Sequence, residues 1–272
     1  MYLERKLYRR LLDWKASDRR KPLIIRGARQ VGKSTLVRAF SKEYDSFMEV
    51  NLERKENNDL FELSSVKEIL EVLLLREGIE VDQNPLLLFI DEIQESPAAI
   101  KMLRYFYEDY PEVHVICAGS LLEFALNEIE SFPVGRVQQF VLQPFDFEEY
   151  LNAAGKTQVL EALNAIPFEK HYFDIIMKHF HQYVSIGGMP EIVLNYINKG
   201  SASGLNAIYE EIWQSYLDDT EKYGKNQTQK NVLRHIIQTA AHEKDRITMG
   251  GFGNSDYKSR EVGEALRALD KS

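Results

Sequence analysis

Residues 27–34, Gly-Ala-Arg-Gln-Val-Gly-Lys-Ser, match the phosphate-loop pattern Gly-x-x-x-x-Gly-Lys-Ser/Thr at every fixed position. The glycines let the backbone curl so that successive N–H groups point at phosphate oxygens, and the helix that follows presents its positive end to the same anion. We expect Lys33 to reach the β and γ phosphates and the Ser34 hydroxyl to bind Mg²⁺. The predicted nucleotide-binding residues of this loop are Gly27, Ala28, Arg29, Gln30, Val31, Gly32, Lys33, Ser34 and Thr35.

A pair of carboxylates follows a second apolar segment. Residues Leu86–Ile90 are all apolar and end in Asp91 and Glu92. A strand with this composition would deliver Asp91 at its carboxyl end, beside the phosphate loop, where the carboxylate can hold Mg²⁺ directly or through water. Glu92 is then suitably placed to orient and deprotonate a water aimed at the γ phosphate, so the pair indicates hydrolysis.

The first half of the chain has the organisation that these motifs need. Short apolar runs alternate with stretches of helical spacing, and several runs are apolar at every position, which is typical of strands buried on both faces of a parallel sheet. The runs are Leu23–Ile25, Phe47–Leu52, Leu86–Ile90, Val113–Ala118 and Val137–Leu142. Val66–Arg76 and Ala98–Tyr110 are the expected crossover helices, and an amphipathic helix with Leu3, Leu7, Leu11 and Trp14 on one face is expected first. Residues 1–144 therefore predict an α/β core.

After Pro144 the apolar residues follow helical spacing, so residues 145–248 predict a helical second unit, interrupted at Gly187-Gly188-Met189-Pro190. Residues 249–272 begin with a glycine-rich linker and end in a helical segment. Its apolar residues Val262 and Ala265 need a partner that we do not expect this chain to supply, so the segment is interpreted as truncated.

Five motifs in this chain occur together. They are the 27–35 loop, the Asp91-Glu92-Ile93-Gln94 box, Ala118-Gly119-Ser120, Gly135-Arg136 ahead of Gln143-Pro144-Phe145, and Gly188-Met189-Pro190-Glu191. In combination they resemble a family of prokaryotic AAA-superfamily P-loop ATPases, over roughly residues 1–200. The resemblance implies a sheet of order 5-1-4-3-2 followed by a helical lid. It further implies a C-terminal domain of unknown, nuclease-like character, missing or barely begun here, and a winged-helix unit starting at residues 259–270.

Ser120 has two interpretations. In the implied sheet order the strand Val113–Ala118 lies between the phosphate-loop strand and the Asp91 strand, so Ser120 would approach the γ phosphate as a polar sensor. Alternatively, Ser120 and Glu123 form the capping box of a new helix, which explains the same residue types.

Arg136 likewise has two interpretations. Relatives in the superfamily often present an arginine at this point to the nucleotide of a neighbouring subunit, where a guanidinium stabilises charge on the transferring phosphoryl group. We expect it at the rim of the edge of the sheet that holds the nucleotide. The alternative is a local ion pair with Glu130 or Asp146.

Charge is distributed unevenly. Residues 1–38 hold 12 Lys and Arg against 3 Asp and Glu, whereas the remainder holds 22 against 39. A positive first segment attracts polyphosphate or nucleic acid, while the acidic remainder argues against a dedicated nucleic-acid binder. For Arg5, Lys6, Arg9 and Arg10 a solvated helix face is the plainer interpretation.

The composition excludes intrinsically disordered, collagen-like and coiled-coil proteins. Hydrophobic residues at 44% and charged residues at 28% are the proportions of a globular protein. The single cysteine, Cys117, cannot form an internal disulfide, and the apolar runs fall far short of the ~20 residues that a membrane span needs. We therefore expect a cytoplasmic protein without a membrane partner.

The sequence as a whole indicates a Mg²⁺-dependent ATP hydrolase of AAA type, with Lys33, Glu92 and Arg136 in catalytic roles and Ser34 and Asp91 as metal ligands. No Asn-Lys-x-Asp tetrapeptide for reading guanine occurs, which favours ATP. Two alternatives stay open: a slowly hydrolysing nucleotide switch, and an ATPase subunit of a DNA-processing or defence system. A homo-oligomer, a nucleic-acid partner and a protein partner are all compatible with the sequence.

Overall fold

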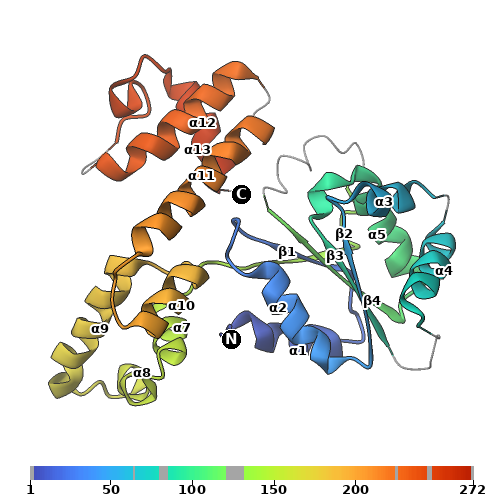
Figure 1. Cartoon of the computed structure of the whole chain (residues 1–272), viewed down its shortest axis with the longest axis horizontal. Coiled ribbons are helices and arrows are strands. Elements are labelled where there is room, and N and C mark those ends of the chain that lie inside the picture. The colour runs from blue at the N-terminus through green and yellow to red at the C-terminus, as the bar shows by residue number, and fades with distance from the viewer. Residues whose placement is uncertain are drawn as a thin grey trace.

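The computed structural model describes residues 3–63, 65–79, 85–120, 132–223, 226–243 and 247–270. At residues 222, 223 and 270 it describes the backbone only. Its centre is a five-stranded sheet in the order β2-β3-β4-β1-β5 (Figure 1). The strands are β1 (Leu23–Arg26), β2 (Ser46–Asn51), β3 (Leu86–Asp91), β4 (Val113–Gly119) and β5 (Gln138–Val141). Every pairing is parallel, and read from the other edge the order is the expected 5-1-4-3-2.

Alternate residues of the inner strands face two separate layers. On one face the sheet packs against α1 (Leu7–Ala16) and α2 (Lys33–Phe40), and on the other against α4 (Val66–Glu77) and α5 (Pro97–Asp109). Thus Leu87 and Phe89 of β3 belong to the first cluster, whereas Leu88 and Ile90 belong to the second. A short helix α3 (Lys55–Asn58) precedes α4. Burial on both faces explains why β3 and β4 are apolar at nearly every position.

The two crossover helices begin at side-chain caps. Ser65 accepts a hydrogen bond from the Glu68 amide at the start of α4, and Ser96 accepts one from the Ala99 amide at the start of α5. Gly78, with φ 64°, ends α4 in the left-handed region that glycine favours. Both helices lie within one residue of their predicted ranges.

The first helix is shorter than predicted. It starts at Leu7, and Leu7, Leu11 and Trp14 pack on the sheet as expected. Leu3, predicted on the same apolar face, lies before the helix and packs instead against the apolar cluster of the helical second unit. The N-terminal segment therefore contacts both halves of the molecule.

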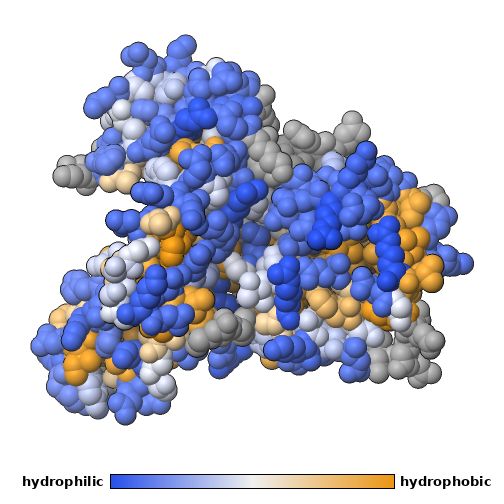
Figure 2. Space-filling view, in the orientation of Figure 1, coloured by the Kyte–Doolittle hydropathy of each residue, from blue (hydrophilic) through white to orange (hydrophobic). Residues whose placement is uncertain are grey.

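The described residues from 145 to 223 form helices and loops, without a strand. The α-helices are α7 (Phe147–Ala153), α8 (Thr157–Asn164), α9 (Phe173–Ile186), α10 (Pro190–Lys199) and α11 (Leu205–Tyr223). Their shared core includes Phe145, Leu151, Ile192 and Val193. We call residues 145–223 the lid. Its helix α9 exposes apolar side chains at Phe173, Ile175, Phe180 and Val184, and the lid in Figure 2 has apolar patches on an otherwise hydrophilic face.

The C-terminal helix has a partner, contrary to the sequence interpretation. α13 (Ser259–Asp270) packs against α12 (Gln227–Thr239), and Val262 and Ala265 are fully buried against Val232, Ile236 and Phe252. The partner residues precede α13 in the chain. The boundary expected at residue 248 consequently falls between two helices with a common core. Figure 1 shows α11, the last helix of the lid, running between the other lid helices and this pair.

No helix among the described residues is sufficiently long and apolar to span a bilayer.

Candidate nucleotide-binding site

The 27–34 loop leaves β1 at its carboxyl end and leads into α2, as the motif requires. Gly27, Gln30 and Gly32 have positive φ values of 148°, 62° and 91°. A Cβ on Gly27 would lie 2.2 Å from the carbonyl oxygen of Leu142, because Gly27 follows β1 and Leu142 follows the neighbouring strand β5. Glycine is needed here for the conformation and for the close approach.

Lys33 lies inside the loop. Its side chain is buried, and Nζ donates hydrogen bonds to the carbonyl oxygens of Gly27 at 2.7 Å and Ala28 at 2.9 Å. Burial lowers the pKa of the ammonium to about 8, against the opposing effect of Glu92 and Asp91. An ammonium held by two carbonyl oxygens inside a loop that contains Gly27 and Gly32 is well suited to exchange these oxygens for phosphate oxygens.

Ser34 and Asp91 meet at the start of α2. The Ser34 hydroxyl donates to Asp91 Oδ2 at 2.8 Å, and Asp91 is buried at the end of β3. Burial raises the pKa of Asp91, with the Ser34 hydrogen bond acting in the opposite direction. A hydroxyl and a carboxylate at this separation are oxygen ligands of the kind Mg²⁺ prefers, so the residues present fit the implied metal.

Glu92 is held by a residue to which sequence analysis gave no role. Its backbone has φ 55°, in the left-handed region, and Gln94 Nε2 donates to Glu92 Oε2 at 2.5 Å. Gln94 Oε1 is buried without a hydrogen-bond partner in the described part of the chain. It occupies space above Gly119, where a Cβ would lie 2.6 Å from Oε1. In the sequence, Gln94 was noted only as the last residue of the Asp91-Glu92-Ile93-Gln94 motif that contributes to the family resemblance.

Ser120 follows β4 at the same edge of the sheet. It is 1% exposed, and within the described residues Oγ has no hydrogen-bond partner. Glu123, the partner required by the capping interpretation, lies outside the described residues. A buried hydroxyl without a partner beside the phosphate loop is compatible with a polar sensor, which stays a prediction.

The other loop residues differ in their surroundings. Val31 is fully buried in the cluster beneath α2, while Gln30 and Thr35 are exposed. Arg29 pairs with Asp219 of α11, with Nε 3.0 Å from Oδ1.

Arg136 does not lie where it was expected. It precedes β5, whose first residue Gln138 is paired with Leu23, the first residue of β1. Arg136 therefore lies at the amino-end edge of the sheet, opposite the edge from which the phosphate loop departs. Of the two expected local partners, Asp146 pairs with Lys6, and Glu130 lies outside the described residues. Instead Nε is 2.5 Å from Glu108 of α5, which also binds Arg104.

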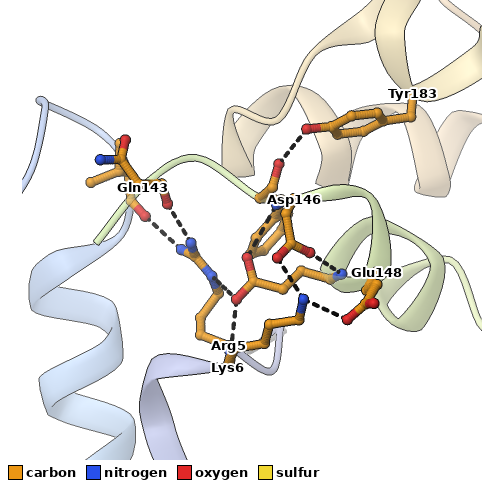
Figure 3. A network of polar contacts seen from close by, with 9 residues as sticks. Arg5, Lys6, Gln143, Asp146, Glu148 and Tyr183 are labelled. Atoms are coloured by element: carbon orange, nitrogen blue, oxygen red, sulfur yellow. Dashed lines mark hydrogen bonds and ion pairs between the residues drawn. The ribbon is translucent and has the colours of Figure 1, made fainter. Parts of the chain in front are cut away.

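Arg5, expected on a solvated helix face, is buried between the loop and the lid (Figure 3). Its guanidinium donates to the carbonyl oxygens of Val31 at 2.8 Å and Gln143 at 2.5 Å, and to Glu149 at 3.2 Å. It also lies 4.3 Å from the ring centre of Phe145. Lys6 remains half exposed and pairs with Asp146 and Glu148. The N-terminal segment, the phosphate loop and the lid thus share one polar network.

The Gly188-Met189-Pro190-Glu191 motif also serves this junction. A Cβ on Gly188 would lie 2.2 Å from the carbonyl oxygen of Phe145, and the Phe145 amide donates to the Gly188 carbonyl oxygen at 2.7 Å. Tyr183 donates to Phe145 O at 2.8 Å (Figure 3). The segment that joins sheet and lid is consequently fixed by backbone contacts that only glycine permits at position 188.

The sheet order and the position of the loop define the P-loop nucleotide-binding fold. Residues 19–151 match a family model described as an AAA domain, and residues 177–272 match one described as a domain of unknown function. No curated protein matches the chain. These regions correspond to the sheet with the start of the lid, and to the helices from α9 onward.

Two solved structures are similar to the chain. The Walker-type ATPase PABY2304 of Pyrococcus abyssi has a TM-score of 0.59 at 15% identity, covering 99% of this chain and 89% of that chain. The Orc1 protein of Aeropyrum pernix, in complex with DNA, has a TM-score of 0.41 at 14% identity, covering 97% of this chain and 81% of that chain. The first structure shares the fold of this chain, and the AAA match over residues 19–151 supports an AAA-type P-loop core.

Proposed function

We propose that the protein binds ATP with Mg²⁺ at residues 27–35 and hydrolyses it, and that nucleotide state changes the position of the lid and the C-terminal helices. The observation that best supports this is the contact between Ser34 and Asp91, which joins the loop to the carboxyl end of β3 at 2.8 Å. The proposed parts are a core over residues 1–144 and a lid that begins at residue 145.

Binding is assigned to the loop. Its backbone amides and the Lys33 ammonium would contact the β and γ phosphates, while the hydroxyl of Ser34 and the carboxylate of Asp91 would hold the metal. When bound, Mg²⁺ would neutralise charge on the phosphate oxygens. Ser120 would donate its hydrogen bond to the terminal phosphate.

Hydrolysis is assigned to Glu92. Its carboxylate would orient a water towards the terminal phosphorus and accept a proton from it as the water oxygen attacks. The bond between that phosphorus and the β–γ bridging oxygen would break, and ADP would leave. Gln94 already fixes the position of one carboxylate oxygen. Arg136 lies on the opposite edge of the sheet from the loop, so a catalytic role for it requires the nucleotide of a neighbouring subunit.

A slowly hydrolysing switch is the second candidate. Two of the proposed catalytic groups are engaged within the chain, Glu92 with Gln94 and Arg136 with Glu108. The contact of Arg136 must change before its guanidinium acts on a substrate, and only one of the two carboxylate oxygens of Glu92 is bonded to Gln94. A switch would use the bound triphosphate mainly to fix the lid.

Phosphate release by the full chain in Mg·ATP, with and without DNA or RNA, separates these candidates. Repeated turnover that Lys33→Ala abolishes supports the hydrolase. Binding of Mg·ATP without turnover supports the switch, and no binding at all contradicts both. Strong stimulation by nucleic acid that declines with salt would support a nucleic-acid partner.

A further inference from the structure

The lid helix α11 contacts the phosphate loop directly. The hydroxyl of Tyr216 donates to the carbonyl oxygen of Arg29 at 3.5 Å, and one turn further along α11 the carboxylate of Asp219 binds the Arg29 guanidinium at 3.0 Å. Asp219 is buried, whereas Arg29 is about one-third exposed. A lid side chain therefore contributes a negative charge to the loop that is proposed to hold phosphate.

The charge of Asp219 acts on Lys33 as well as on Arg29. Burial lowers the pKa of Lys33, and the charge of Asp219 acts in the opposite direction, as do the larger effects of Glu92 and Asp91. Arg29 and Lys33 are thus both influenced by a carboxylate that belongs to the lid. Because Asp219 is removed from water, screening of these interactions is weaker than on the surface.

A bound triphosphate would bring further negative charge to the same loop. Its oxygens would compete with Asp219 for Arg29, and the two anions would repel each other in a partly buried site. Phosphate binding and the contact between lid and loop are therefore expected to oppose one another.

We propose that Asp219 is an internal competitor of phosphate, and that nucleotide binding breaks the Arg29–Asp219 ion pair and releases α11 from the loop. The inference rests on the proposed nucleotide binding and names the contact through which the lid responds to it. In the nucleotide-free protein the ion pair holds the lid against the loop. The apparent ATP affinity is then the intrinsic affinity multiplied by the fraction of molecules in which this ion pair is open.

Titration calorimetry with Mg·ATP compares the wild-type chain, Asp219→Asn and the control Asp218→Asn. Asp218 is the exposed neighbour, bonded to Gln214 on the same helix. Asp219→Asn keeps the size of the side chain and removes its charge, so affinity should rise roughly tenfold. Asp218→Asn should leave affinity within twofold of wild type. Inorganic triphosphate, a probe without base or ribose, should show the same gain with Asp219→Asn, because the competition concerns phosphate alone.

A distance measurement tests the movement itself. Spin labels on Lys42→Cys, beyond α2, and Glu210→Cys, on α11, are placed at exposed positions, while Cys117 is fully buried. Adding Mg·ATP should lengthen the distance between the labels in the wild-type background. Asp219→Asn should show part of the longer distance before nucleotide is added.

The outcomes separate this inference from the proposed function. A wild-type chain that fails to bind Mg·ATP contradicts both. A wild-type chain that binds it, together with a folded Asp219→Asn variant of unchanged or weaker affinity, overturns only the role of Asp219. If Asp219→Asn does not fold, an unchanged label distance in the wild-type background on ATP addition overturns it equally.

Discussion

Arg5 donates a hydrogen bond from Nη1 to the carbonyl oxygen of Val31 at 2.8 Å, so a residue ahead of the first helix supports the phosphate loop. The same guanidinium binds Glu149 of α7, which in turn accepts a hydrogen bond from the Lys6 amide. The loop, the N-terminal segment and the lid are therefore mechanically connected through one cation.

Replacing Arg5 by Ala should strongly destabilise the protein. The change leaves the buried carboxylate of Glu149 without its charged partner, and breaking a buried ion pair in this way costs about 3–5 kcal/mol. Urea unfolding measures the loss. Arg9→Ala, at an exposed position of α1, is the control and should change the free energy of unfolding by less than about 0.5 kcal/mol. Equal effects of the two substitutions would contradict the role of Arg5.

Nucleotide binding should be coupled to protonation of Lys33. Its pKa is lowered to about 8 by burial, so an appreciable fraction of the ammonium groups has lost a proton at pH 8.5. Phosphate oxygens favour the charged form and raise the pKa, so ATP binding at pH 8.5 should take up part of a proton. Calorimetry in two buffers of different ionisation enthalpy measures this uptake.

Lys33→Ala is the matched variant for that measurement. It should lose at least tenfold in ATP affinity and should lose the proton uptake as well, because the titrating group is absent. Uptake that persists in Lys33→Ala would assign the proton to another group.

Glu92→Gln should separate binding from hydrolysis. The amide has the shape of the carboxylate but cannot accept a proton, so turnover should fall about 100-fold or more. Mg·ATP affinity should be retained, since Ser34 and Asp91 remain in place. Calorimetry and phosphate release on the same preparation measure both quantities. Hydrolysis within a few fold of wild type would favour another base.

The sequence predicted what depends on short spacing. The 27–34 loop and the Asp91-Glu92 pair each lie within a few consecutive residues. Continuous apolar runs predict the buried strands. The sheet order came from the family resemblance and agrees with the structure. These features need no knowledge of distant contacts.

Contacts between distant residues were not predictable in the same way. Arg5 and Glu149 are 144 positions apart, and nothing in a basic N-terminal segment distinguishes the one arginine that is buried. Arg136 binds Glu108, 28 positions earlier, an acid that was not considered as its partner from the sequence. Asp219 lies in an acidic stretch of α11 and shows its relation to Arg29 only when the helix is folded over the loop.

The buried histidine of β4 makes stability depend on pH. His114 Nδ1 lies 2.7 Å from the hydroxyl of Tyr44, and burial, with the charges of Arg20 and Lys15, lowers its pKa to about 3. Below pH 6.5 the unfolded chain binds a proton at this histidine and the native chain does not. Stability should therefore fall as the pH decreases from 6.5 towards 3, by about 2 kcal/mol at pH 5.

Urea unfolding at pH 7 and pH 5 measures the effect. His114→Gln removes the titrating ring, so the difference between the two pH values should shrink by about 2 kcal/mol. The exposed His181→Gln variant should keep the wild-type difference. If His114→Gln and wild type lose the same stability, His114 is not the group responsible.

Arg136 should act only across a subunit interface. It lies at the amino-end edge of the sheet, with its guanidinium bound to Glu108, so the nucleotide of its own subunit is beyond reach. If subunits assemble head to tail, Arg136→Ala should bind Mg·ATP normally and hydrolyse it roughly 10³ to 10⁵ times more slowly, the range for arginine fingers in other P-loop enzymes. Phosphate release and calorimetry measure the two effects. Arg104→Ala, which removes the other partner of Glu108, should keep its turnover.

Mixing the inactive variants tests the interface itself. Where Arg136→Ala meets Glu92→Gln, the first subunit supplies an intact loop and Glu92 while the second supplies the arginine, so activity should return although each variant alone is inactive. Sedimentation of the mixture establishes that the two variants assemble together. Activity that stays absent in a demonstrated mixed assembly excludes Arg136 as a residue acting in trans, and so does a full chain that remains monomeric with Mg·ATP while hydrolysing it. In either case the ion pair with Glu108 is the whole role of Arg136, a bridge between α5 and the start of β5.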